Sequence, residues 1–509
     1  MSNINSIAKN TAFLYLRMFF ILGVTLYTSR IVLDQLGVSD YGIYSLVGGI
    51  VSMLSFFRGA MANATRRYLS FDIGKGDFER LKKTFSATLT IHFIIAIVVL
   101  ILAETIGLWY LTNKMVFPEN RLFAVQVVYQ FSVLTFLINI LQVPYDALLQ
   151  AREKMKIYAI VSIVEAFLKL AIVYVLIYFG SDKLVTFSIL TFFVALIIRL
   201  IYQFYCRNNF VESKYQFEYD KQYFKELLTY SGWNLFGSLA VVARGQGSNV
   251  ILNLFFGTTI NAAYGITTQI QMAVQLFVNN FQLAINPQII KTYAQGDLKQ
   301  NHRLIIKASK LSYFLLFIII CPIWFNIDYI LQLWLKNIPE YTPIFVKLVL
   351  IYVLIDTISG PLMVGAQATG KIKFYQIIVG TLLFLNLPIS YFLLKECNMK
   401  PMIVFDLMII LSIITLFFRI WFLKNMINLS VKEFITKVLL PILFVSIVSI
   451  VIIFLFIPLF KTDNQFVVFL FRVCTIFIII CPLIATLGLH REEKYFLKAI
   501  FLKKTIKKQ

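Results

Sequence analysis

Apolar runs of about twenty residues recur from one end of this 509-residue chain to the other. Each run is long enough to cross a hydrocarbon core of ~30 Å as a helix that rises ~1.5 Å per residue. Hydrophobic residues make up 59% of the chain and charged residues only 14%, whereas soluble domains carry ~25% charged residues. No part of the sequence is polar enough to form a separate domain in water. The sequence therefore predicts a polytopic membrane protein.

Charged and turn residues divide the apolar runs into fourteen predicted spans. Strands of a membrane barrel would be about half as long and would alternate in polarity, so helices are predicted throughout. The predicted spans cover residues 10–33, 41–63, 84–108, 122–147, 157–179, 184–206, 229–256, 261–287, 308–329, 343–366, 374–394, 402–423, 434–458 and 466–488.

The distribution of Lys and Arg predicts the orientation of the spans. If the N-terminus is cytoplasmic, the segments on that side carry 31 basic residues and the segments on the opposite side carry 7. Because cytoplasmic segments are enriched in Lys and Arg, both termini are predicted to lie in the cytoplasm. The formal net charge of +22 reflects this bias and contact with anionic lipid. It is spread over many short segments, which argues against a nucleic-acid partner.

The sequence repeats itself at an offset of 217 residues, most clearly around the fourth and tenth spans. Six identities pair Pro144, Gln150, Ala151, Lys154, Lys156 and Tyr158 with Pro361, Gln367, Ala368, Lys371, Lys373 and Tyr375. The dipeptide Gly76-Asp77 also recurs, as Gly296-Asp297, after the equivalent spans two and eight. Six spans separate the copies, and an even number of spans leaves both copies in the same orientation. Parallel repeats about an axis along the membrane normal are therefore predicted.

The predicted fold is an all-α polytopic membrane protein with two parallel six-helix lobes and two appended helices. The N-lobe covers residues 1–206 and the C-lobe residues 229–424, joined by a cytoplasmic amphipathic linker at 207–228. The two appended helices lie within residues 434–488, and a basic cytoplasmic tail covers 489–509.

Nine basic residues lie within predicted spans, where a cation at the bilayer centre costs on the order of 3 kcal/mol. Lys347 and Arg419 are close enough to an interface to extend their charged ends to water, and Arg199 and Arg472 are further candidates for this. Arg244 and Lys169 are too central for that.

Two kinds of site are predicted from these central charges. Glu165 precedes Lys169 by one helical turn, so a structural ion pair and an element that couples protons or ions are both open interpretations. Arg244 has no acidic residue within one turn of its own helix. Together with Arg17 and Arg58 it predicts a cavity that accepts an anion.

The eighth span has one polar face, formed by residues at steps of three or four. Two interpretations of this face stay open, helix–helix contact through amides and the wall of a polar cavity, and the second is favoured because seven consecutive positions exceed one contact. Candidate substrate ligands are Gln271, Gln275 and Asn279 on this face and Asn234 on the seventh span. The face consists of Tyr264, Thr268, Gln271, Gln275, Asn279, Gln282 and Asn286.

The sequence contains no motif that predicts catalysis, a metal or a cofactor. Its five cysteines have no CxxC spacing and its three histidines are far apart. A phosphate-binding GxxxxGK[ST] loop is absent as well. No catalytic residue, metal ligand or cofactor is therefore predicted.

The order of the spans, the opening Lys9-Asn10-Thr11 and the turn from Leu36-Gly37 to Tyr41-Gly42 resemble the polysaccharide-type flippases of the multidrug/oligosaccharidyl-lipid/polysaccharide superfamily. The resemblance covers essentially the whole chain and is nearest to Wzx-type translocases of O-antigen or capsule repeat units. It implies a V-shaped, MATE-like fold with a central cavity formed largely by spans one, two, seven and eight. It also implies cationic residues that meet an undecaprenyl-pyrophosphate-linked glycan, and no enzymatic activity.

The function that the resemblance implies is translocation of lipid-linked glycan from the cytoplasmic to the outer leaflet of the bacterial inner membrane, by alternating access. Membrane lipids are expected partners, and glycan polymerases or glycosyltransferases stay open as further partners. A multidrug or other small-molecule exporter of the same fold is an alternative, with Asp356 and Glu165 as candidate carboxylates. A membrane glycan polymerase or ligase is less favoured, because the predicted outer loops are short and lack acid–base residues.

Overall fold

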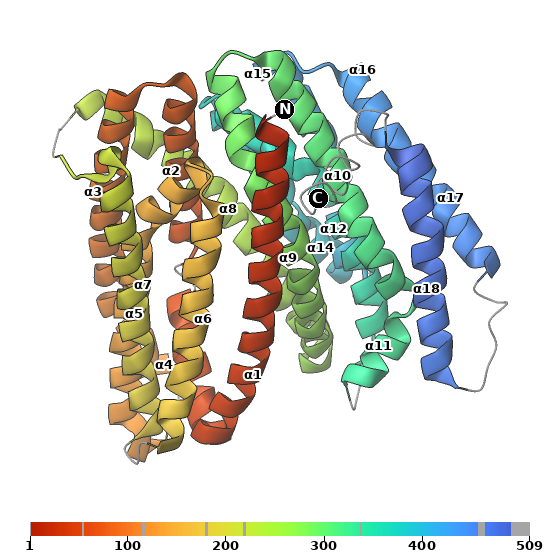
Figure 1. Ribbon diagram of the computed structural model, residues 1–509. Coiled ribbons are helices and arrows are strands. Elements are labelled where there is room, and N and C mark those ends of the chain that lie inside the picture. Colours follow the sequence, from red (N-terminus) through yellow and green to blue (C-terminus); the bar gives the residue numbers. More distant parts are fainter. Residues whose placement is uncertain are drawn as a thin grey trace, which may run out of the picture. The chain divides into compact units, whose positions relative to one another are not determined.

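The structure is a computed structural model that describes residues 2–52, 55–114, 118–178, 182–216, 220–335, 338–456 and 464–489 (Figure 1). Over these residues the chain is helical and has no β-strand. Ten helical segments of the described chain are long and apolar enough to cross a membrane. Every predicted span falls on helices, and the second covers the end of one helix and the start of the next. The prediction of an all-α, multi-pass membrane protein is confirmed.

The chain packs as two compact units. The N-unit is Asn10–Ser238, and the C-unit is Leu239–Gln509 together with Met1–Lys9. Helix α8 (Lys221–Phe256) contributes its first half to the N-unit and its second half to the C-unit. The predicted lobe boundaries stay predictions, and the predicted basic tail lies, after residue 489, outside the described residues.

The N-unit is a bundle built around α5 (Leu122–Ala151), which packs against α2, α3, α6 and α7. Pro144 lies inside α5, a position that membrane helices tolerate because neighbouring groups satisfy the freed carbonyl. The other helices of this bundle are α1 (Ser2–Ser52), α2 (Ser55–Lys75), α3 (Phe78–Leu102), α4 (Leu108–Lys114), α6 (Met155–Tyr178) and α7 (Lys183–Asn209).

The C-unit is built in the same way around α12 (Thr342–Ala368), which packs against α9, α10 and α15. Two short helices, α16 (Val431–Phe434) and α11 (Ile327–Trp334), accompany the long ones. The long helices are α9 (Thr258–Ala294), α10 (Leu298–Phe325), α13 (Lys373–Phe384), α14 (Asn386–Glu396), α15 (Ile403–Ile427), α17 (Leu440–Phe456) and α18 (Gln465–Leu483).

The internal repeat is visible in which helices touch. In the N-unit α5 contacts α2, α3 and α7, and in the C-unit α12 contacts their equivalents α9, α10 and α15. The pair α2 and α3 corresponds to α9 and α10, and the contact of α6 with α7 corresponds to that of α13 and α14 with α15. Two homologous six-helix arrangements therefore follow from the 217-residue repeat.

The two units share one turn in detail. After α2, Gly76 has a φ of 72° and its N–H donates to the carbonyl of Ile73 at 3.2 Å. After α9, Gly296 has a φ of 77° and donates to the carbonyl of Tyr293 at 3.0 Å. Positive φ values of this kind are easy only for glycine. The aspartate after each glycine caps the next helix, as Asp77 accepts from the N–H of Arg80 and Asp297 from that of Gln300, both at 3.0 Å.

The first two predicted spans are separated at Gly37, as the sequence predicts. Two helical stretches of α1 meet at this glycine, whose φ of 73° and ψ of 169° are not helical, and the second predicted span continues from the end of α1 into α2. Residues 53 and 54, inside the second predicted span, lie outside the described residues. A positive φ of this kind is easy only for glycine, and it ends one helical stretch and lets the next begin.

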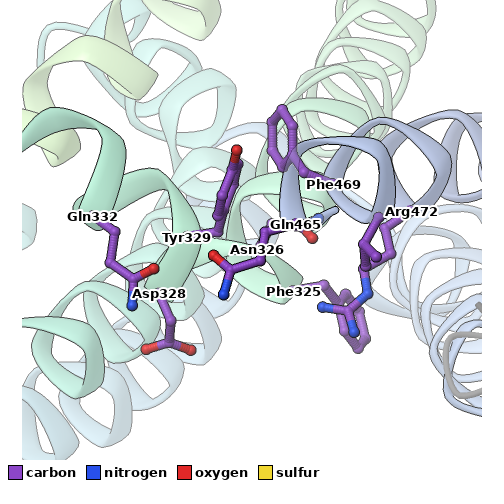
Figure 2. Close-up of a pocket in the computed structure, with 9 residues that line it drawn as sticks. Phe325, Asn326, Asp328, Tyr329, Gln332, Gln465, Phe469 and Arg472 are labelled. Atoms are coloured by element: carbon purple, nitrogen blue, oxygen red, sulfur yellow. The ribbon is translucent and has the colours of Figure 1, made fainter. Parts of the chain in front are cut away.

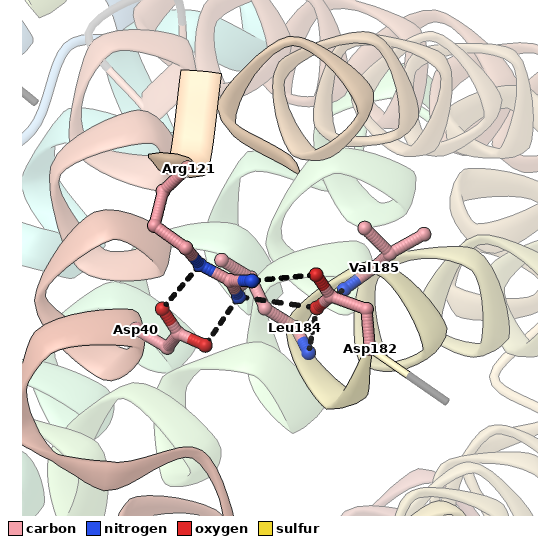
Figure 3. A network of polar contacts seen from close by, with 5 residues as sticks. All are labelled: Asp40, Arg121, Asp182, Leu184 and Val185. Carbon is pink, nitrogen blue, oxygen red and sulfur yellow. Dashed lines mark hydrogen bonds and ion pairs between the residues drawn. The ribbon is translucent and has the colours of Figure 1, made fainter. Parts of the chain in front are cut away.

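Three connections at one end of the N-unit are tied together by a single arginine (Figure 3). Arg121, before α5, donates from Nε to Asp40 of α1 at 2.9 Å, and a second bond joins the same two side chains. It also donates from Nη1 to Asp182 at 2.6 Å. Asp182 in turn caps α7 by accepting from the N–H groups of Leu184 and Val185. This bidentate geometry is the one that suits guanidinium and carboxylate.

Helices α17 and α18, which follow the twelve predicted spans of the two repeats, pack against each other and α18 packs against α10. Their other faces expose large apolar side chains, including Phe444, Ile447 and Phe454 on α17 and Leu470 and Phe471 on α18. Surfaces of this kind are stable when lipid covers them.

Candidate functional site

In the N-unit, charged side chains gather around the carboxylate of Asp146, near the end of α5. Gln142, one turn earlier, donates from Nε2 to both carboxylate oxygens at 3.2 Å. The guanidinium groups of Arg58 and Arg17 attract the same carboxylate, Arg58 more strongly. Helices α1, α2 and α5 thus bring two of the predicted cavity arginines to one acidic residue.

Arg17 also contacts an aromatic ring. Its guanidinium lies 4.7 Å from the ring centroid of Tyr158 on α6, which is a cation–π contact. Its Nε is buried and has no hydrogen-bond partner within the described part of the chain. Arg66, beyond the end of the second predicted span, lies near Tyr158 and attracts Asp146, so a third arginine joins this cluster.

The predicted pair on α6 lies beside the cluster. Lys169 donates from Nζ to Oε1 of Glu165 at 2.6 Å, and the two side chains are 52% and 36% exposed. Glu165 also acts on Asp146, by repulsion between the two carboxylates. The role of this pair as a coupling element stays a prediction.

In the C-unit, Arg244 has an aromatic and an acidic partner on another helix. It donates from Nη2 to the hydroxyl of Tyr352 on α12 at 2.6 Å and lies 4.9 Å from the centroid of that ring. Asp356, one turn further along α12, attracts the guanidinium, and Tyr264 of α9 is close as well. Arg244 is only 6% exposed, so these contacts replace the water that a buried charge loses.

A second arginine of the C-unit joins this group. Arg419 of α15 donates from Nη1 to the hydroxyl of Tyr375 at 2.6 Å. It is 6% exposed, so the prediction that it extends to an interface is wrong. Tyr375 interacts with Asp356 too. By the repeat, Tyr375 is the equivalent of Tyr158, and each of the two tyrosines contacts an arginine of its own unit.

The polar face of α9 divides into two kinds of position. Tyr264 donates to the carbonyl of Gly245 at 2.7 Å, and Gln282 donates to Ser312 at 3.2 Å and to the carbonyl of Thr357 at 3.1 Å. These positions near the ends of the face connect helices. Three consecutive amides between them, Gln271, Gln275 and Asn279, make no side-chain hydrogen bond to any described residue, and none of them is fully buried. Their donors and acceptors are free for a ligand or water.

The remaining predicted ligand, Asn234, is 3% exposed and lies in the N-unit part of α8. Its Nδ2 donates to the carbonyl of Tyr230, one turn earlier, at 3.3 Å. The predicted site residues are therefore shared between the units. Arg17, Arg58, Asn234 and the Glu165–Lys169 pair belong to the N-unit, and Arg244 and the three amides of α9 to the C-unit.

A cavity of about 200 Å³ lies within the N-unit, between α1, α5 and α7. Its walls include Gly48 of the second predicted span and Ser132, Thr135 and Asn139 of α5. By the repeat, Asn139 is the equivalent of Asp356. The same position therefore carries a neutral amide in the N-unit and a carboxylate in the C-unit.

The two clusters have the same charge pattern. Asp146 lies among three arginines in the N-unit, with Glu165 nearby, and in the C-unit Asp356 lies near Arg244 and shares the neighbour Tyr375 with Arg419. Guanidinium groups in excess of carboxylates, with tyrosines and amides, suit a phosphate and a hydroxyl-rich ligand. In the described part of the chain, no three His, Cys, Asp or Glu residues are placed to hold a metal ion.

Sequence reasoning missed most partners of the arginines. Asp146 lies near the end of its predicted span, and Tyr352 and Asp356 look like isolated polar residues in an apolar run. The signal that was present is the repeat, because it matches Tyr158 with Tyr375. Contacts between helices far apart in sequence cannot be read from the spacing along one helix.

Similar solved structures support the fold. A multidrug resistance MATE family transporter of the MOP superfamily, in an outward-facing conformation, superimposes with a TM-score of 0.72 at 12% identity, covering 84% of this chain and 98% of that one. A MATE protein in the straight conformation has a TM-score of 0.72 at 11% identity, covering 84% and 96%. A MOP superfamily transporter from Pyrococcus furiosus, described by a binding pocket of reverse polarity, has a TM-score of 0.69 at 12% identity, covering 84% of this chain and 98% of that one.

At this identity the structures establish the fold alone, and no curated protein sequence matches the chain significantly. The family is established by sequence. The family model described as polysaccharide biosynthesis protein matches residues 7–293, which is more than half of the chain and includes Arg17, Arg58 and the three amides of α9. The chain therefore belongs to the polysaccharide biosynthesis protein family and has the fold of MOP superfamily transporters.

Proposed function

We propose that the protein is a flippase for lipid-linked oligosaccharide, which moves undecaprenyl-pyrophosphate-linked glycan repeat units from the cytoplasmic to the outer leaflet of the bacterial inner membrane by alternating access. The observation that carries the proposal is the excess of arginine over carboxylate in both clusters, in a member of the polysaccharide biosynthesis protein family. In the proposed orientation both termini are cytoplasmic, as the Lys and Arg bias indicates.

The chemistry divides the work between two kinds of side chain. A pyrophosphate is a diffuse anion that guanidinium groups bind through two parallel hydrogen bonds. Arg17, with a buried Nε that has no partner among the described residues, has unused donor capacity. The amides of Gln271, Gln275 and Asn279 can both donate to and accept from sugar hydroxyls. The prenyl chain has no need of polar groups and stays in lipid.

The test is glycan export in a bacterial strain that lacks its own translocase. Arg17→Ala and Arg244→Ala should each reduce export at least about tenfold, since a charged hydrogen bond contributes roughly 1.5–3 kcal/mol. Arg244→Lys should keep part of the activity, because the charge survives and the two-pronged geometry does not. Lys437→Ala is the matched control, since it removes one charge from an exposed pair with Glu433. Normal export by both alanine variants, at normal membrane levels, would refute the proposal.

Orientation has its own test with a thiol reagent that does not cross the membrane. Cys397 is exposed and lies in a segment proposed to face outward, so it should react in intact cells as the sole cysteine. Lys299→Cys, made in a cysteine-free background, lies on the side proposed to be cytoplasmic and should be protected. The reverse pattern would invert the proposed direction of transport.

A MATE-type exporter of small molecules is the second candidate, because the similar solved structures include a multidrug resistance MATE transporter. Such a function would use Asp146 or Asp356 to bind a cation. Asp356→Asn should then abolish export of a cationic dye, whereas the flippase proposal expects no dye export by the wild type. Glycan complementation together with dye export distinguishes the two.

A further inference from the structure

A pocket of about 300 Å³ lies in the C-unit, between the α10–α11 corner and the first turns of α18 (Figure 2). This volume is at the lower end of ~300–1,000 Å³ for small-molecule sites. The pocket shares no residue with the arginine clusters described above. Its walls are Phe325, Asn326, Asp328, Tyr329, Gln332, Gln465, Val468, Phe469 and Arg472.

The charge in the pocket comes from Arg472 on α18. Its Nε is buried and has no hydrogen-bond partner among the described residues. Figure 2 shows this guanidinium on the α18 side of the pocket and the Asp328 carboxylate on the α11 side. Asp328 is paired with Lys347 of α12 at 3.4 Å. The carboxylate is therefore partly neutralised from outside the pocket, and the guanidinium keeps unused donors inside it.

The other walls are amides and aromatic rings. Asn326 uses its Nδ2 to donate to the carbonyl of Pro322 at 2.9 Å, which leaves its carbonyl oxygen as an acceptor. Gln332 and Gln465 line the same space without a hydrogen bond to any described residue. Tyr329 and Phe469 face each other with ring centroids 5.2 Å apart. One guanidinium with amides and rings suits a phosphate ester on a hydroxyl-bearing group.

The surface around the pocket is apolar, which favours a phosphate ester that is part of a lipid over a free phosphate compound. On α18, Phe466 is 52%, Leu470 44% and Phe471 51% exposed, next to the pocket residues Gln465 and Phe469 in sequence. α17 exposes a further apolar face. A free, fully hydrated phosphate compound gains nothing from such a surface, whereas a lipid places its chains on it.

We propose that this pocket binds the phosphate-bearing head group of a membrane lipid, with Arg472 on the phosphate, the amides of Gln332 and Gln465 on the head-group hydroxyls, and the acyl chains along α17 and α18. The site is separate from the arginine clusters and does not depend on what the protein transports. It assigns to the appended helices a role in holding lipid at the edge of the C-unit.

The test uses purified, delipidated full-length protein in detergent and native mass spectrometry. Phosphatidylglycerol is the probe, and diacylglycerol with the same acyl chains is the probe without a phosphate. Wild-type protein should retain one phosphatidylglycerol molecule more tightly than the rest, and Arg472→Gln should weaken that binding about tenfold, the loss expected for one charged hydrogen bond. Arg199→Gln is the matched control, because Arg199 also has a buried Nε without a partner among described residues and pairs with Gln203 of its own helix.

Three outcomes would overturn the proposal. They are equal phosphatidylglycerol binding by wild type and Arg472→Gln, equal retention of diacylglycerol and phosphatidylglycerol, and displacement of the tight lipid by inorganic phosphate, which would assign the pocket to a free phosphate compound. Arg472→Lys, which keeps the charge, should bind more tightly than Arg472→Gln. Thermal unfolding of both variants shows whether any loss comes from misfolding.

Discussion

Two turns occupy equivalent places in the repeat, α2–α3 in the N-unit and α9–α10 in the C-unit, and they differ in the side chains buried beneath them. The backbones share the hydrogen bond that closes the turn. The N–H of Asp77 donates to the carbonyl of Asp72, and that of Asp297 to the carbonyl of Thr292, both at 3.1 Å. The equivalent of Asp72 is therefore a threonine, and the equivalent of Leu81 is Asn301.

In the N-unit a charge is buried under the turn. The side chain of Asp72 is 0% exposed, accepts a hydrogen bond from the Thr84 hydroxyl and pairs with Arg80 at 3.3 Å. The linker between the repeats joins the same group, since the hydroxyls of Tyr223 and Thr84 are 2.5 Å apart. Asp72 lies between the second and third predicted spans, outside the membrane-spanning segments.

In the C-unit the same turn is held by neutral groups. Asn301 is 0% exposed and donates from Nδ2 to the carbonyl of Ile289 at 2.6 Å and to the Thr292 hydroxyl at 3.2 Å. The turn itself therefore does not need a buried charge. The carboxylate of Asp72 is found in the unit where the linker docks against α3, which indicates that it serves that docking.

Exchanging the two buried residues should have the largest effect. Leu81→Asn places an amide in an apolar site and should destabilise the N-unit by about 4 kcal/mol, from lost apolar burial and an unpaired polar group. Asn301→Leu should cost about 2 kcal/mol, because only the donors to Ile289 and Thr292 are lost. Thermal unfolding in detergent measures both. Equal losses would show that the two sites are interchangeable.

The next effect is a pH dependence that only the N-unit turn should have. Burial raises the pKa of Asp72 from 3.8 to about 6, against the hydrogen bond from Thr84 and the attraction of Arg80. The folded protein then holds this proton more tightly than the unfolded chain does. Stability from this site is full below pH ~4 and is lost as the pH rises from ~4 through ~6, by about 3 kcal/mol.

The measurement is the difference in unfolding midpoint between Asp72→Asn and the wild type, followed from pH 4 to pH 7. The asparagine keeps a neutral polar group at this site. The unfolding midpoint of the variant relative to that of the wild type should therefore increase as the pH rises, and should stay constant above pH ~6. Thr292→Val, at the equivalent position, serves as the control and should give no pH-dependent difference. A difference for Asp72→Asn that grows toward acid pH would contradict this reading.

Alanine at the two turn glycines should have nearly equal effects. Gly76 and Gly296 both have positive φ, and a Cβ would meet no atom within 4 Å at either position. Only the backbone strain of a left-handed residue is added, about 1.5 kcal/mol for Gly76→Ala and the same for Gly296→Ala. A difference of more than about 1 kcal/mol between the two would break the equivalence of the turns.

The smallest effect should come from the two capping aspartates. Asp77→Ala and Asp297→Ala each remove one side-chain acceptor at a helix N-terminus, which costs about 1 kcal/mol. Hydrogen exchange of the first turns of α3 and α10 would locate the loss. Asn in place of either Asp should restore most of the protection, since an asparagine caps equally well.

The sequence predicted the helices well. In lipid every backbone N–H and C=O group must find its hydrogen-bond partner within the protein, and few structures other than helices achieve this. The repeat predicted which helices correspond, and the Gly-Asp dipeptides marked the shared turns. The burial of Asp72 was not predicted, because Arg80 looked like one of many basic residues between spans. Nor were the partners of Arg244 predicted, since Tyr352 and Asp356 lie over a hundred residues away along the chain. Charge pairing across helices depends on packing that spacing within one helix does not reveal.

The clamp of Arg121 on Asp40 and Asp182 has a consequence for engineering the protein. One side chain closes the ends of three connections, so a tag or loop inserted beside any of them would have to separate two carboxylates from their shared guanidinium. Insertions are tolerated where the local chain is exposed and makes few hydrogen bonds or ion pairs. The α13–α15 side of the C-unit offers a better place, since Lys400 and the residues before it are exposed and lie between helices. A fluorescent or affinity label is therefore best placed in this segment. The Arg121 contacts of the N-unit are best left unchanged.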